Sequence, residues 1–143
     1  MGRSRGETRV VAALIAVAWL CGGCASWALS TGSALDQAAV QTESEVQTLR
    51  LAATAALQEP APTVLLEVVI DDVDAALAEA AAKASGGEGE PERRAALLAL
   101  IEDGRRIVPD LRAAVRAGDA AELRNGRDRA DGVAAALDEW RGR

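Results

Sequence analysis

Side chains that act as nucleophiles, general bases or soft metal ligands are scarce in this sequence. It has no His, Tyr or Phe, and its two cysteines, Cys21 and Cys24, both lie near the N-terminus. The absence of His excludes a Ser–His–Asp triad and the Glu-x-x-His motif of di-metal bundles. A serine with Lys83 is the remaining nucleophilic arrangement, and a carboxylate-only glycosidase would need aromatic residues near its two acids. We therefore expect no enzymatic activity and no cofactor.

Three acidic residues recur at helical spacing in the middle of the chain: Glu67, Asp71 and Asp74. Spacings of i, i+4 and i+7 place their carboxylates on one flank of a helix, where oxygen atoms could gather a hard cation. The glycine-turned loop that positions the oxygen ligands of the usual Ca²⁺ site is missing from this stretch. We keep cation binding as a candidate and favour a solvated face or partners for arginines of a neighbouring helix.

Positive charge is concentrated in the second half of the chain. Residues 24–90 carry two cations and eleven acids, whereas residues 91–143 carry eleven arginines and ten acids. Because the first half alone would repel itself, we predict that acids of residues 67–79 lie against arginines of residues 105–129. The net charge of −6 argues against binding nucleic acid, whose phosphates require a basic face.

Arg105, Arg106 and Trp140 are the candidate partner-facing residues. The two guanidinium groups could contact anionic lipid or a protein, although Glu102 lies four residues before Arg106, in the order that favours pairing along a helix. Trp140 continues an apolar stripe close to the C-terminus. We expect it to cap the end of a helical core, and the alternative is an anchor that faces a partner.

The N-terminal segment, residues 1–29, has the layout of an export signal. Three arginines among the first nine residues precede an apolar run over residues 10–20. That run is too short to cross about 30 Å of hydrocarbon as a helix, but with its weaker continuation to residue 29 it could span as an uncleaved anchor. In such an anchor the positive N-terminus stays inside and the following domain lies outside.

The string LCGGC at residues 20–24 resembles the lipobox of bacterial lipoproteins. In that class two small residues precede a cysteine whose thiol is acylated and whose amine becomes the new N-terminus after cleavage. The resemblance therefore implies that Cys24 is lipidated and that the domain lies at the extracytoplasmic face of a bacterial membrane. Cys21 departs from the pattern, because the class usually has leucine there. Cleavage after Ala28, within a small-x-small pattern, is a further alternative.

Residues 30–143 are predicted to form one helical domain of four segments. Apolar residues recur at spacings of three and four in each segment, which places them on one helix face. The four stripes are Leu35, Ala39, Thr42, Val46, Leu49, Ala53 and Ala56; Leu66, Val69, Ile70, Val73, Leu77, Ala80 and Ala84; Leu97, Ile101, Gly104, Val108, Leu111, Val115 and Gly118; and Leu123, Gly126, Ala130, Val133, Leu137 and Trp140.

Proline and glycine mark the ends of these segments. The Pro-Ala-Pro sequence at residues 60–62 ends the first, and Thr63 is a fair cap for the second. The β-branched residues within 64–70 leave a short strand as an alternative. Pro109 lies inside the third segment, where the apolar phase continues, so we favour a kinked helix over a stop and restart. Gly118 followed by an Asp-x-x-Glu box predicts a helix end and a new start.

Four stripes with short connections predict an antiparallel four-helix bundle, with three helices as the alternative. The stripes are rich in alanine, so the core is small and we expect modest stability. The expected function is a non-catalytic, membrane-tethered extracytoplasmic module that binds a protein or acts as a spacer at the cell envelope. The alternative is a sensor-like domain that binds a ligand or a cation.

Overall fold

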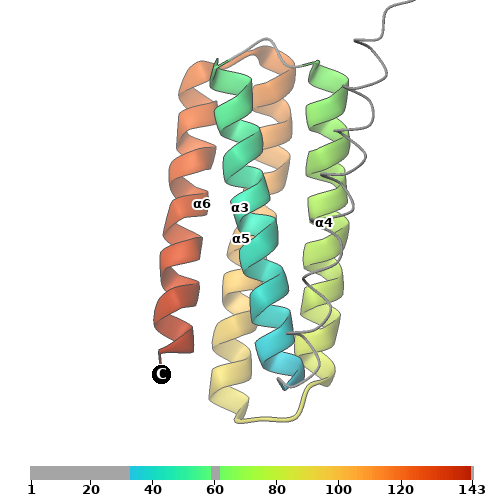
Figure 1. The fold of residues 1–143 in the computed structure, drawn as a ribbon, viewed down its shortest axis with the longest axis vertical. Helices are drawn as coiled ribbons and strands as arrows, with labels where there is room; N and C mark the ends of the chain where they lie inside the picture. The colour runs from blue at the N-terminus through green and yellow to red at the C-terminus, as the bar shows by residue number, and fades with distance from the viewer. Residues whose placement is uncertain (1–32, 59–61, 143) are drawn as a thin grey trace, which may run out of the picture. The chain divides into compact units, whose positions relative to one another are not determined.

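The computed structural model describes residues 33–58 and 62–142; the N-terminal segment with Cys21 and Cys24 lies outside the described residues. The described chain forms α3 (Ala34–Gln58), α4 (Thr63–Gly86), α5 (Pro91–Ala117) and α6 (Ala120–Arg141), and contains no strand. The helices run alternately up and down as an antiparallel bundle (Figure 1). The predicted four-helix bundle is confirmed, and the three-helix and strand alternatives are wrong.

The bundle has two central and two lateral helices. α3 and α5 contact each other and both remaining helices, whereas α4 and α6 lie on opposite sides and do not meet (Figure 1). The central helices accordingly bury wider faces, with eight buried residues each against six each in α4 and α6. All of the largest fully buried side chains, from Trp140 to Val73, belong to one continuous core.

The predicted stripes match the buried residues most closely in the lateral helices. In α6 the two sets are identical, and in α4 they differ only at the half-buried Val69. The stripes of the central helices missed Ala38, Ala52, Ile107 and Ala114, which are buried. These residues flank the predicted stripes, because a helix that contacts three neighbours must bury more than one narrow face.

Side-chain caps fix two of the helix starts. At α3, the Ser33 hydroxyl accepts a hydrogen bond from the Asp36 N–H at 3.2 Å, while Asp36 Oδ2 accepts from the Ser33 N–H at 3.3 Å. Asp119 caps α6 by accepting from the N–H groups of Ala121 and Glu122. Gly118 ends α5 with φ at +63°, the left-handed conformation predicted from its place before Asp119.

Two local predictions about the helices have different outcomes. Thr63 does not cap α4: it is the first helical residue, and Pro62 occupies the cap position without a side-chain bond. The carbonyl oxygen of Pro62 accepts from the N–H groups of Leu65 and Leu66, which starts the helix one residue early. α5 continues through Pro109 as one helix, so the predicted continuity is confirmed and the stop is wrong.

The two ends of the bundle differ in what they carry. One end, called the proximal end below, holds the start of α3, the connection between α4 and α5, and the last turn of α6 (Figure 1). The distal end holds the first turn of α4 and the connection from α5 to α6. None of the described helices has both the length and the apolar character needed to cross a bilayer.

Candidate interaction surfaces

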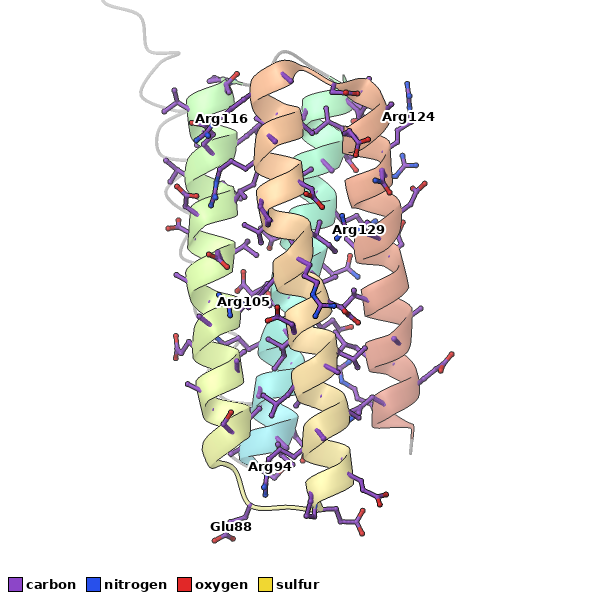
Figure 2. The ribbon with its side chains drawn as sticks, turned by 180° about the vertical axis from the view of Figure 1, so that it is seen from behind. Glu88, Arg94, Arg105, Arg116, Arg124 and Arg129 are labelled. Carbon is purple, nitrogen blue, oxygen red and sulfur yellow. The ribbon has the colours of Figure 1, made fainter. Side chains whose placement is uncertain are left out.

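The three candidate cation ligands of α4 face arginines of α5. The ion pairs are Glu67 with Arg116, Asp71 with Arg112, and Asp74 with Arg105 at 3.4 Å. Arg105 and Arg116 both lie along the line where α4 and α5 meet (Figure 2). The predicted contact between the acidic and arginine-rich halves is therefore confirmed. Among the described residues, no group of three or more Asp, Glu, His or Cys side chains is arranged to hold a metal ion.

Antiparallel packing explains the order of these pairs. Moving four residues along α4, from Glu67 to Asp71, matches moving four residues back along α5, from Arg116 to Arg112. Three residues farther along α4, Asp74 corresponds to the uncharged Pro109 of α5, and it pairs instead with Arg105, one turn beyond. The carboxylates thus neutralise arginines in sequence along one helix contact.

Arg105 and Arg106 are also engaged within their own helix. Arg105 lies 3.8 Å from Glu102, and Arg106 lies 3.7 Å from Glu102 and 3.1 Å from Asp103. The predicted pairing of Glu102 with Arg106 is confirmed. A partner that used these two guanidinium groups would have to compete with carboxylates already beside them.

A groove of about 380 Å³ lies between α5 and α6, where Gly132 and Ala136 leave room. Its floor includes Leu100, Ile107 and Val133, and Arg106 and Arg129 stand at its rim. Arg129 pairs with Asp110 at 2.6 Å and donates to the carbonyl oxygen of Arg106 at 3.2 Å. Since both rim arginines already have acceptors in the bundle, the groove presents no cation poised for an anionic ligand.

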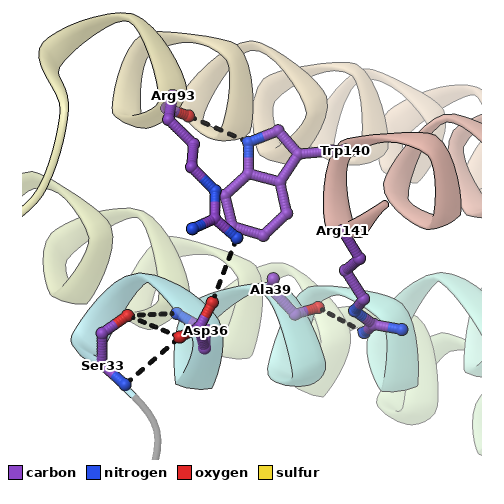
Figure 3. A network of polar contacts seen from close by, with 6 residues as sticks. All are labelled: Ser33, Asp36, Ala39, Arg93, Trp140 and Arg141. Atoms are coloured by element: carbon purple, nitrogen blue, oxygen red, sulfur yellow. Dashed lines mark hydrogen bonds and ion pairs between the residues drawn. The ribbon is translucent and has the colours of Figure 1, made fainter. Parts of the chain in front are cut away.

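Trp140 lies inside the proximal end rather than on a partner-facing surface. Its side chain is 2% exposed, and its Nε1–H donates to the carbonyl oxygen of Arg93 at 2.9 Å (Figure 3). The Arg93 guanidinium covers the ring, 4.3 Å from the centroid, and pairs with Asp36 at 3.3 Å. The alternative of an exposed anchor is wrong, because Arg93 and the core enclose the indole.

The contact between α3 and α6 is also bridged by opposite charges. Arg141 pairs with Glu43 and reaches the carbonyl oxygen of Ala39, and Arg50 lies 3.1 Å from Asp131. Arg93 of α5 and Arg141 and Asp131 of α6 therefore provide the oppositely charged partners of α3 side chains.

The contact between α3 and α4 has a different character. Gln41 donates to the carbonyl oxygen of Ala76 at 3.1 Å and accepts from Lys83 Nζ at 2.9 Å. Farther along, burial raises the pKa of Glu45, and the neighbouring carboxylate of Asp72 raises it further. No ion pair joins α3 to α4 within residues 33–58 and 62–142. Sequence spacing could not reveal this pair of like charges, because it depends on the register between two helices.

Large apolar side chains that remain exposed gather on the same two helices. They are Val40 at 46%, Leu51 at 65%, Val64 at 72%, Leu65 at 58% and Val68 at 51% exposed. Across the described parts of α5 and α6 no large apolar side chain is exposed to this degree. Among the described residues, the exposed large apolar side chains are therefore confined to the first half of the bundle.

The chain matches no protein-family model, no curated protein and no solved structure.

Proposed function

We propose that the chain is a non-catalytic helical module tethered to the extracytoplasmic face of a bacterial membrane, where it binds a protein partner. The observation that carries this proposal is the lipobox-like string at residues 20–24 a short distance before a separate compact unit that begins at Ser33. The residues between Cys24 and Ser33 can reach at most about 30 Å when fully extended. A lipid on Cys24 would thus hold the bundle close to the membrane.

The shape of the bundle supports a role in presenting a surface. Its longest helix, α5, has 27 residues, which corresponds to about 40 Å at 1.5 Å per residue. Because α3 starts at the proximal end, a short tether would keep that end nearest the lipid. The distal end would then face partners in the envelope.

The chemistry of the described side chains favours binding over catalysis. The arginines across α4 and α5 are matched with carboxylates at partly exposed positions, where such pairs are ordinary surface features. The groove between α5 and α6 is lined by one carboxylate, Asp103, which is already paired with Arg106 at 3.1 Å. What remains on the surface is an exposed apolar area next to uncompensated acids, which suits a protein contact.

The tether is tested by replacing each cysteine separately. Cys24→Ser should abolish acylation and move the protein out of the lipid-modified pool, whereas the matched control Cys21→Ser should leave both unchanged. Mass spectrometry of the mature N-terminus provides the measurement. A wild-type chain that is unmodified and starts at Met1 or Leu29 would remove the lipid tether from the proposal.

A further inference from the structure

Three exposed apolar side chains lie together on the first turns of α4, near the distal end of the bundle. Val64 and Val68 are one helical turn apart on α4, with Leu65 beside them. The hydrogen bond from Gln41 to the Ala76 carbonyl fixes the antiparallel register of the two helices. Carried along the helices, that register brings the exposed Leu51 of α3 level with the first turns of α4. We call Val64, Leu65 and Val68 the distal apolar patch.

Two carboxylates without a cationic partner adjoin this patch. Asp72 follows Val68 by one turn on the same face of α4, and Glu45 lies across the helix contact from Asp72. Neither carboxylate forms an ion pair within the described part of the chain, unlike Glu67 and Asp71 on the opposite flank of α4. Burial raises the pKa of Glu45, and the carboxylate of Asp72 raises it further.

We propose that the distal apolar patch, with Glu45 and Asp72, is a docking surface for a basic amphipathic helix of another protein. Apolar side chains of that helix would cover the patch at i and i+3 or i+4 spacing. Lysine or arginine side chains one turn farther along would meet the two carboxylates. The proposal rests on the proposed function, because it names the partner chemistry for the tethered module.

Charge selects this occupant over two others. A second copy of the chain, joined through a two-fold contact, would contribute the same acidic surface a second time, so Glu45 and Asp72 would gain two more acids in the interface. Anionic lipid headgroups would likewise be repelled by these carboxylates. A basic helix satisfies both the apolar side chains and the charges at once.

The test uses the full chain, purified from whole cells in excess neutral detergent. The probe is an immobilised synthetic helix of about 18 residues, five turns, with leucine on one face and lysine on the other. A peptide of the same composition but without an apolar face is the control probe. We expect the full chain to bind the amphipathic probe and not the scrambled one.

Variants locate the binding on the surface. The double variant Leu65→Ser with Val68→Ser should weaken binding about tenfold or more, because the apolar area covered by the probe is lost. Val40→Ser, at an exposed position elsewhere on α3, is the matched control and should bind normally. Asp72→Lys should weaken binding of the lysine probe severalfold and create binding to a probe with glutamate in place of lysine.

Three results would overturn the docking surface. They are equal binding of the scrambled probe, unchanged binding by the Leu65 and Val68 double variant with helicity retained, and a dimer of the wild type that this variant dissociates. Lipidation plays no part in this assay. Failure of the tether would appear only in the Cys24→Ser experiment, so the two proposals fail separately.

Discussion

α4 makes two lateral contacts that are opposite in charge chemistry. Toward α5, three of its carboxylates meet three arginines in antiparallel order. Toward α3, its carboxylate Asp72 meets the carboxylate Glu45, and a glutamine and a lysine provide the polar contacts. Both contacts flank the same apolar core. Helix association therefore does not depend on charge pairing, and charge can be left uncompensated on one side.

The difference follows from chain order. Residues 24–90 contain only two cations, so α3 and α4, which are consecutive and adjacent, have little with which to neutralise each other. α4 meets cations only on α5, and α3 receives them from Arg93 on α5 and Arg141 on α6. Within the described residues, no arginine forms an ion pair across the contact that the two acidic helices share.

The largest expected loss of stability comes from a substitution in the apolar core beneath both contacts. Leu77 is 0% exposed, and it packs where Gly104 leaves α5 without a side chain. Leu77→Ala should lower the free energy of unfolding by about 2–5 kcal/mol, because it removes buried methyl groups and leaves a cavity. Chemical denaturation followed by circular dichroism measures the change.

The matched control for that variant is Leu51→Ala, which makes the same substitution at a side chain that is 65% exposed. It should change stability by no more than about 0.5 kcal/mol. Equal losses of stability in the two variants would show that Leu51 is covered in solution. That result would contradict the exposure of its side chain in the bundle.

Sequence periodicity predicted most of the fold, for a physical reason. A lateral helix buries one stripe, and the stripe ending at Trp140 corresponds fully to the buried face of α6. A central helix buries more than a stripe, so Ala38 and Ile107 could not be assigned without knowing which helices lie diagonally. The Ser33–Asp36 cap is present in the sequence as a spacing of three, which apolar periodicity does not detect.

The interaction surfaces were predictable only in part. Counting charges indicated that acids of α4 would meet arginines of α5, because a contact between opposite charges is favoured over one between like charges. The contact of Arg93 with Trp140 joins residues 47 apart, and only the bundle's register brings them together. The apposition of Glu45 and Asp72 has the same origin. Spacing within one helix cannot predict a contact that depends on the register between two helices.

A smaller effect should distinguish the α4–α5 contact. A double-mutant cycle with Asp71→Asn and Arg112→Met should give a favourable coupling of about 0.2–1 kcal/mol, because both side chains are partly exposed. Unfolding measured at low salt gives the coupling, and added salt should reduce it. A coupling of zero at low salt would mean that the ion pair follows from helix packing and adds nothing to it.

The smallest effect belongs to the α3–α4 contact and has the opposite sign. Glu45 has a pKa above its ordinary value of 4.5, first through burial and then through Asp72. The folded state therefore binds this proton more tightly than the unfolded state, and ionisation of Glu45 at neutral pH destabilises the bundle. Glu45→Gln should raise stability at pH 7 by about 0.5 kcal/mol, or about 2–4 °C in Tm.

The pH dependence of this gain identifies its cause. The advantage of Glu45→Gln over the wild type should be full above the raised pKa, should shrink as pH falls through it, and should vanish below the ordinary value of 4.5, where Glu45 is neutral in both states.

Asp72→Asn should also stabilise at pH 7, and the two substitutions together should give less than the sum of their effects, because either one removes the repulsion. Thermal unfolding of the four proteins from pH 7 to pH 4 measures all of this. A lower Tm for Glu45→Gln at pH 7 would show that the carboxylate has a favourable partner, and the two sides of α4 would then be alike.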